Sequence, residues 1–179
     1  MIKVIEKALS EEMCKYISLN TDLLFHMLEY PPDKITPNST GYYAPFFLEA
    51  LSVHLQPLVE KTVSKKLYPT YTYGRIYYNK SSLKKHTDRP AGEYGVSCCI
   101  QKEVDWPIFF ENGDNVKSYE MNVGDICVYK GMEYSHWREE YTGNKHIQVF
   151  LMYVDVDGDY ADQKWDKRPG LCHEGVQGD

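Results

Sequence analysis

The sequence contains a histidine and a carboxylate two residues apart, His86-Thr87-Asp88, followed fifty residues later by His136. Side chains two apart on a β-strand point to the same side, so His86 and Asp88 can offer a nitrogen and an oxygen to one metal ion. His136 can supply the third ligand. Two histidines and one carboxylate on one face of an octahedral ion leave the opposite face open, an arrangement suited to oxygen chemistry at non-haem Fe(II).

The elements that must position these residues are predicted to be strands. Residues 75–78 read as a strand before the triplet, residues 94–100 as a strand after it, and residues 125–129 as a strand leading to a glycine turn before His136. All three candidate ligands therefore fall near strand ends. The alternative interpretation makes His86 and Asp88 ordinary turn residues and His136 a histidine at the rim of the fold.

The rest of the chain gives an outline of the fold. A strand is expected at residues 2–5, followed by a helix that Ser10 caps, which continues to about Tyr30 with a possible break at 20–22 and ends at Pro31-Pro32. A loop around Gly41 leads to a second helix over residues 45–66, which Pro57 is expected to kink or split. Short strands separated by turns follow.

This order of elements favours a mainly β protein with N-terminal helices. We expect a double-stranded β-helix, a jelly-roll of the cupin-like kind, with the helices buttressing one outer face. At 179 residues, the chain is interpreted as one domain with helical support at 1–69, a jelly-roll core at 70–155 and a polar tail at 156–179.

Composition limits the remaining possibilities. The start lacks a signal-peptide pattern and no stretch approaches 18 apolar residues, so we expect a soluble, cytoplasmic protein without a membrane partner. Five cysteines, an odd number, favour reduced thiols over a disulfide framework. A net charge of −6 argues against binding of duplex nucleic acid through bulk charge. Four basic residues near the triplet would suit an anionic ligand, although solvated turn residues explain each equally well: Lys80, Lys84, Lys85 and Arg89.

Taken together, these residues resemble the 2-oxoglutarate/Fe(II)-dependent dioxygenases, and within them the prolyl-hydroxylase-like branch. The resemblance covers residues 71–155 and rests on the following positions: Tyr78, His86-Thr87-Asp88, Gly124-Asp125, Gly131, His136 and Gly143-Asn144-Lys145. It implies Fe(II) held by His86, Asp88 and His136, with 2-oxoglutarate as cosubstrate. Dioxygen and an unidentified prime substrate are the expected partners, and the expected reaction is a hydroxylation coupled to decarboxylation of 2-oxoglutarate to succinate.

The resemblance also implies residues that bind the cosubstrate. Lys145, nine residues after His136, would meet the distal carboxylate of 2-oxoglutarate, and Tyr78 would donate a hydrogen bond to it. A register slip of one residue would place His146 on the inner face instead of Lys145, and a plain turn lysine is a further alternative.

The sequence also allows two other classes of function. One is a cupin-like metalloenzyme that holds Zn, Mn or Ni through the same three ligands and has no use for a carboxylate partner. The other is a non-catalytic binding module, against which the intact triad argues.

Overall fold

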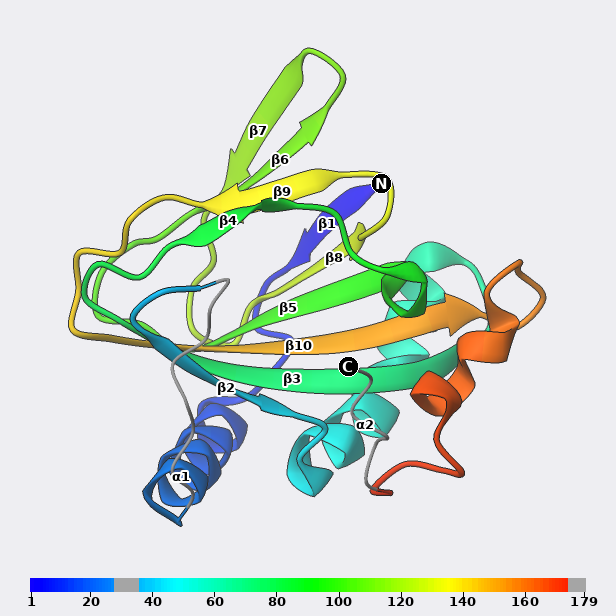
Figure 1. The fold of residues 1–179 in the computed structure, drawn as a ribbon, viewed down its shortest axis with the longest axis horizontal. Helices are drawn as coiled ribbons and strands as arrows, with labels where there is room; N and C mark the ends of the chain where they lie inside the picture. Colours follow the sequence, from blue (N-terminus) through cyan, green and yellow to red (C-terminus); the bar gives the residue numbers. More distant parts are fainter. Residues whose placement is uncertain (28–35, 174–179) are drawn as a thin grey trace.

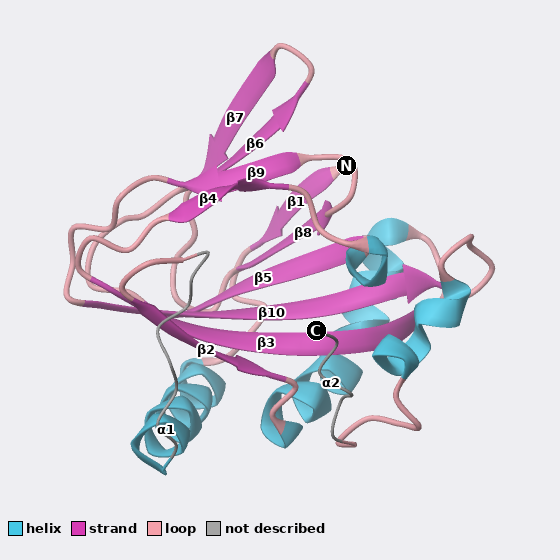
Figure 2. Cartoon of the chain, in the orientation of Figure 1, coloured by secondary structure: helices cyan, strands magenta, loops and turns pink. Residues whose placement is uncertain are grey.

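Two antiparallel sheets face each other in the computed structural model, which describes residues 1–27 and 36–173. The large sheet has six strands in the order β1-β8-β5-β10-β3-β2, and the small sheet has four in the order β4-β9-β6-β7 (Figure 1). The two α-helices cover the large sheet on the side away from the small sheet (Figure 2). This is the jelly-roll buttressed by helices that the sequence predicts.

The elements follow one another in an order that threads both sheets. They are β1 (Ile2–Ile5), α1 (Glu11–Met27), β2 (Ser39–Tyr43), α2 (Phe46–Val63), β3 (Leu67–Tyr78), β4 (Leu83–His86), the short 3-10 helix η1 (Pro90–Gly92), β5 (Tyr94–Gln101), β6 (Ile108–Asn112), β7 (Asn115–Tyr119), β8 (Ile126–Lys130), β9 (Ser135–Arg138), β10 (Lys145–Asp155) and η2 (Ala161–Lys167). Within the described ranges, no helix has the length and apolar content that a membrane span requires.

The main core lies between the large sheet and the helices. Residues such as Ile147, Val149 and Leu151 of β10 pack there with Leu51 and Leu55 of α2. Side chains alternate along a strand, so the residues between them face the small sheet. We call the side towards the helices the outer face of the large sheet and the side towards the small sheet its inner face. The packing of the outer face therefore determines which residues of β10 face inward.

Both helices are more regular than expected. Helix α1 begins after Ser10, whose hydroxyl accepts a bond from the Met13 amide at 3.2 Å, and it has no break at residues 20–22. Thr21 fits within it because its hydroxyl donates back to the Ile17 carbonyl at 2.8 Å. The predicted end at Pro31-Pro32 lies outside the described residues. Helix α2 continues through Pro57, which lies on an exposed side of the helix.

The segment predicted as a loop around Gly41 is instead an edge strand, β2, paired with β3. Gly41 makes this pairing possible, because a Cβ at that position would lie 2.4 Å from the hydroxyl of Tyr73. The strands β1 and β2 form the two edges of the large sheet. The first 69 residues therefore supply both edges as well as α1 and α2.

Candidate metal centre

The three predicted metal ligands meet between β4 and β9 of the small sheet. His86 is the last residue of β4 and pairs directly with His136, the second residue of β9. Their ring centroids are 4.3 Å apart. Asp88 follows two residues after His86 and turns back towards both rings, so residues fifty positions apart in the sequence converge on one place.

The ligand atoms lie close enough together to converge on a single ion. Asp88 Oδ1 lies 3.9 Å from His86 Nε2 and 3.8 Å from His136 Nε2, and all three ligand atoms lie within 4.8 Å of one another. Two atoms that each bind an ion at about 2.1 Å lie about 3.0 Å apart on one face of an octahedron. The side chains would therefore move together by about 1 Å when they bind an ion.

Backbone carbonyls orient both imidazole rings. His86 Nδ1 lies 2.8 Å from the carbonyl of Lys84, and His136 Nδ1 lies 3.0 Å from the carbonyl of Tyr134. A carbonyl only accepts hydrogen bonds, so each Nδ1 donates to it, and the Nε2 atoms are the ones that face Asp88 and can bind a metal ion. Such bonds orient metal-binding histidines in proteins generally.

Two glycines make room for Asp88. Its amide donates to the carbonyl of Gly131 at 2.9 Å. A Cβ at Gly131 would lie 2.1 Å from Asp88 Oδ2, and one at Gly92 would lie 2.9 Å from the Asp88 Cβ. The sequence indicates Gly131 as a turn residue, but its contact with the carboxylate becomes visible only in the structure.

Burial shifts the pKa of two of these residues towards their neutral forms. It raises the pKa of Asp88 to about 6, with the charge of His86 acting in the opposite direction. Burial, and next the charge of His86, lower the pKa of His136 to about 4, so His136 is neutral. Asp88 Oδ2 is buried, and the nearby Tyr129 hydroxyl interacts with the carboxylate. A divalent cation would stabilise the carboxylate and bind the Nε2 atoms of both histidines, so the donor set fits a metal ion.

A buried arginine lies on the same face of β9 as His136. Arg138 is 2 % exposed, and its guanidinium lies 4.8 Å from the ring centroid of Trp106, whose carbonyl accepts a bond from Nη1. Its Nε and Nη2 have no hydrogen-bond partner within residues 1–27 and 36–173. Burial lowers the pKa of Arg138, yet an arginine remains charged in a protein. The interior therefore contains a cation with two unused donors.

Sequence reasoning did not assign a role to Arg138. The available signal was its position two residues after His136, which on a strand means the same face. The composition gave no indication that this arginine would be buried, because arginines are mostly exposed.

The predicted cosubstrate residues lie on the outer face. Lys145 pairs with Tyr78 across β10 and β3, and its ammonium contacts Asp22 of α1 at 2.6 Å. Tyr78 is 40 % exposed. The expectation that these two side chains face the interior does not match this placement, because the packing of β10 on the helices turns them outward.

Their sequence neighbours, His146 and Tyr77, form the corresponding pair on the inner face. The His146 ring lies 5.2 Å from Trp106, and its Nε2 contacts the amide oxygen of Gln148 at 2.7 Å. Burial lowers the pKa of His146 to about 3, so the ring is neutral. His146 thus occupies the inner position without carrying a positive charge.

The predicted basic rim is only partly at the site. Lys85 makes an ion pair with Glu111 of β6 and lies 4.9 Å from the ring centroid of Trp137. Arg89 is held by Asp166 of η2. Lys80 and Lys84 are exposed.

Comparison with known proteins gives matches only at the level of structure. No protein-family model matches the sequence, and no curated protein matches it. A prolyl-4-hydroxylase from Pseudomonas putida is similar over 86% of this chain and 92% of its own, with a TM-score of 0.67 and 11% identity. The chain has the fold of the 2-oxoglutarate/Fe(II) oxygenases.

Two further structures are similar to the same extent. A prolyl hydroxylase from Trichoplax adhaerens, solved with a hypoxia inducible factor peptide fragment, matches with a TM-score of 0.72 and 9% identity, over 86% of this chain and 83% of its own. HygX from Streptomyces hygroscopicus, solved with nickel and 2-oxoglutarate, matches with a TM-score of 0.66 and 13% identity, over 87% of this chain and 83% of its own. These TM-scores establish a common fold.

Proposed function

We propose that this protein is an Fe(II)- and 2-oxoglutarate-dependent oxygenase that hydroxylates an unidentified substrate. The observation that carries the proposal is the convergence of His86, Asp88 and His136, with both Nε2 atoms available, in a fold shared with such enzymes. The nickel and 2-oxoglutarate in the HygX structure support the same reading.

The three residues would hold Fe(II) through two imidazole nitrogens and one carboxylate oxygen. Bound iron and 2-oxoglutarate supply the redox chemistry, in which dioxygen is reduced, 2-oxoglutarate yields succinate and carbon dioxide, and the second substrate is oxidised. The chain itself contributes orientation. The carbonyls of Lys84 and Tyr134 hold the two rings, and the close packing of Gly131 holds the carboxylate.

We assign Arg138 to the distal carboxylate of 2-oxoglutarate. Residues two apart on a strand are separated by roughly 6.6 Å and share a face, so Arg138 lies beside His136 at a distance that a five-carbon dicarboxylate can span. A guanidinium with two unused donors can bind a carboxylate in a bidentate manner. The ligand would also supply the negative charge that this buried cation lacks among residues 1–27 and 36–173.

Neither of the other candidate partners, Lys145 or His146, places a positive charge in the interior. Lys145 is engaged with Asp22 on the outer face, and His146 is neutral. An uncompensated carboxylate inside the barrel would cost several kcal/mol. Arg138 is therefore the residue of this region that best meets the electrostatic requirement.

The experiment that tests the metal centre is an anaerobic Fe(II) titration of wild type, His86→Ala and His136→Ala. We expect at least a tenfold loss of affinity in both variants, since loss of outer-shell partners alone costs about 10–100-fold. His54→Ala, an exposed histidine of α2, is the matched control and should bind iron as wild type does.

In the iron titration, equal affinity in all four proteins would refute the metal centre. A separate assay of succinate formation from 2-oxoglutarate, with iron and oxygen, tests the reaction. Strong turnover with zinc in the absence of oxygen would favour a cupin-like metalloenzyme instead.

A further inference from the structure

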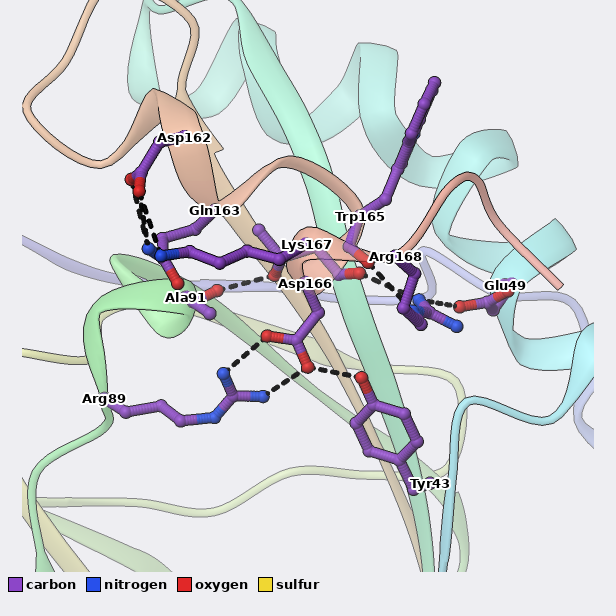
Figure 3. A network of polar contacts seen from close by, with 11 residues as sticks. Tyr43, Glu49, Arg89, Ala91, Asp162, Gln163, Trp165, Asp166, Lys167 and Arg168 are labelled. Carbon is purple, nitrogen blue, oxygen red and sulfur yellow. Dashed lines mark hydrogen bonds and ion pairs between the residues drawn. The ribbon is translucent and has the colours of Figure 1, made fainter. Parts of the chain in front are cut away.

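An internal carboxylate is bound by three donors next to the metal centre. Asp166 of η2 accepts bonds from Arg89 Nη1 at 2.5 Å, from Arg89 Nη2 at 2.7 Å and from the hydroxyl of Tyr43 (Figure 3). The donors come from the loop after β4 and from β2, and they converge on one anion. This arrangement is the bidentate recognition that arginine provides for carboxylates and phosphates.

The donors adjoin the metal ligands in space as well as in sequence. Arg89 directly follows Asp88, and its guanidinium lies 4.1 Å from the ring centroid of Tyr71. Tyr71 also stacks on Tyr43, with 5.8 Å between the ring centroids. Tyr71 thus contacts both donors to Asp166, and one of these donors, Arg89, is the chain neighbour of the candidate ligand Asp88.

The segment that supplies Asp166 has an unfavourable backbone. Trp165, Asp166 and Lys167 have φ values of 54°, 57° and 60°, in the left-handed region that non-glycine residues rarely adopt. Three such residues in succession place the carboxylate opposite Arg89. Backbone strain of this kind clusters at catalytic and ligand-binding sites. Release of Asp166 from Arg89 would allow this turn to relax.

The contact between Asp166 and Arg89 is not the only anchor of this segment. The Arg89 side chain is 47 % exposed and that of Asp166 is 13 % exposed, so solvent screens one partner of the ion pair and reduces its net contribution to stability. The same segment is fixed two residues later by Arg168, which is buried with Glu49 of α2 and also donates to the Thr70 carbonyl at 3.0 Å. The C-terminal segment can therefore stay docked while Asp166 gives up its place.

We propose that Arg89 and Tyr43 form an anion-binding site beside the metal centre, that Asp166 is its internal ligand, and that a carboxylate or phosphate group of the substrate replaces Asp166 there. That the anionic group belongs to a substrate rests on the proposed function, whereas the anion site itself does not. It accounts for one member of the basic rim that the sequence indicates, Arg89, with a ligand of opposite charge already in position.

Asp166→Ala tests the site in the metal-free, full-length protein. Acetate and inorganic phosphate are titrated separately and followed by calorimetry. We expect the variant to bind at least one of them at least tenfold more tightly than wild type, because the internal carboxylate no longer competes. Tighter acetate binding identifies a carboxylate site, and tighter phosphate binding a phosphate site.

Two further variants make this result specific. Asp162→Ala removes a carboxylate of the same segment, one that pairs with Lys167 on the surface, and should behave as wild type does. Adding Arg89→Gln to Asp166→Ala should abolish the gained binding. The proposal is overturned if Asp166→Ala binds neither anion more tightly than Asp162→Ala, or if binding survives the loss of Arg89.

If Asp166→Ala does not fold, Asp166→Asn replaces it under the same criteria, since the amide keeps the shape of the carboxylate without its charge. The titrations contain neither iron nor 2-oxoglutarate. Failure of the anion site would therefore leave the iron titration unaffected, and failure of the metal centre would leave the anion titrations interpretable.

Discussion

Replacing Arg138 by glutamine should weaken 2-oxoglutarate binding far more than it weakens binding of an analogue without the distal carboxylate. The substitution keeps a polar side chain but removes the charge and both unused donors. Truncating one partner of a buried charge pair costs about 2–5 kcal/mol, which corresponds to roughly 30- to 5,000-fold in Kd. The upper part of that range is appropriate here, because Arg138 is 2 % exposed and solvent cannot screen the carboxylate.

The assay compares two ligands in two proteins under anaerobic conditions with Fe(II) present. 2-Oxobutanoate has the same chelating end as 2-oxoglutarate but lacks the distal carboxylate. Wild type should prefer 2-oxoglutarate strongly, and Arg138→Gln should bind the two ligands with similar affinity. Any general effect of the substitution on the metal centre cancels in this comparison.

Lys145→Ala is the matched control. Its charge pairs with Asp22 on the outer face, so the substitution should leave 2-oxoglutarate binding unchanged and cost at most about 1 kcal/mol of stability. If Lys145→Ala loses the preference while Arg138→Gln keeps it, the cosubstrate lies elsewhere and our assignment is refuted. If neither variant changes the preference, another residue binds the distal carboxylate, and our assignment of Arg138 is likewise refuted.

Two further substitutions test how buried groups are accommodated. Gly131→Ala should abolish iron binding, because its Cβ would lie 2.1 Å from Asp88 Oδ2; Gly113→Ala, which meets nothing within 4 Å, should bind iron normally despite a small loss of stability. Glu49→Gln should lower the free energy of unfolding by about 3–5 kcal/mol, since it leaves the charge of its buried arginine partner uncompensated. Glu60→Gln, at a pair whose lysine is 79 % exposed, should cost under about 1 kcal/mol by the same denaturant titration.

The convergence of the three candidate metal ligands could be predicted from the sequence because their chemistry and their strand context agree. Histidine and aspartate two residues apart restrict the geometry strongly, and the turn signals place His136 at the matching depth. Inner and outer residues of β10 could not be separated in this way. The strand is buried on both faces, so residues 147–154 are apolar almost without interruption and hydrophobic alternation gives no register.

The sequence therefore does not show which residue faces inward in two pairs of sequence neighbours, one on β3 and one on β10. Tyr77 and Tyr78 are chemically alike, and Lys145 stands beside His146, so local sequence does not show which of each pair faces inward. Packing of the outer face on the helices decides it, which is a tertiary effect. The strand at Gly41 was missed for a related reason, because glycine there serves close packing under Tyr73 rather than a turn.

Two buried arginines in this chain have contrasting environments. Arg168 has a full set of partners: the carboxylate of Glu49 and the carbonyls of Thr70, Trp165 and His173. Arg138 is buried just as deeply, yet a single carbonyl accepts from it among the described residues.

An arginine that serves only the fold needs the partners that Arg168 has, because an uncompensated buried charge is strongly destabilising. The sequence retains that cost at Arg138, on the inner face two residues from a metal ligand. A residue that is costly in the isolated chain and compensated by an anionic ligand is expected in a binding site, where stability is exchanged for affinity. By this reasoning Arg138→Met should maintain or raise the unfolding temperature of the ligand-free protein while it removes the preference for 2-oxoglutarate. A large loss of stability in that variant would instead identify Arg138 as a structural residue.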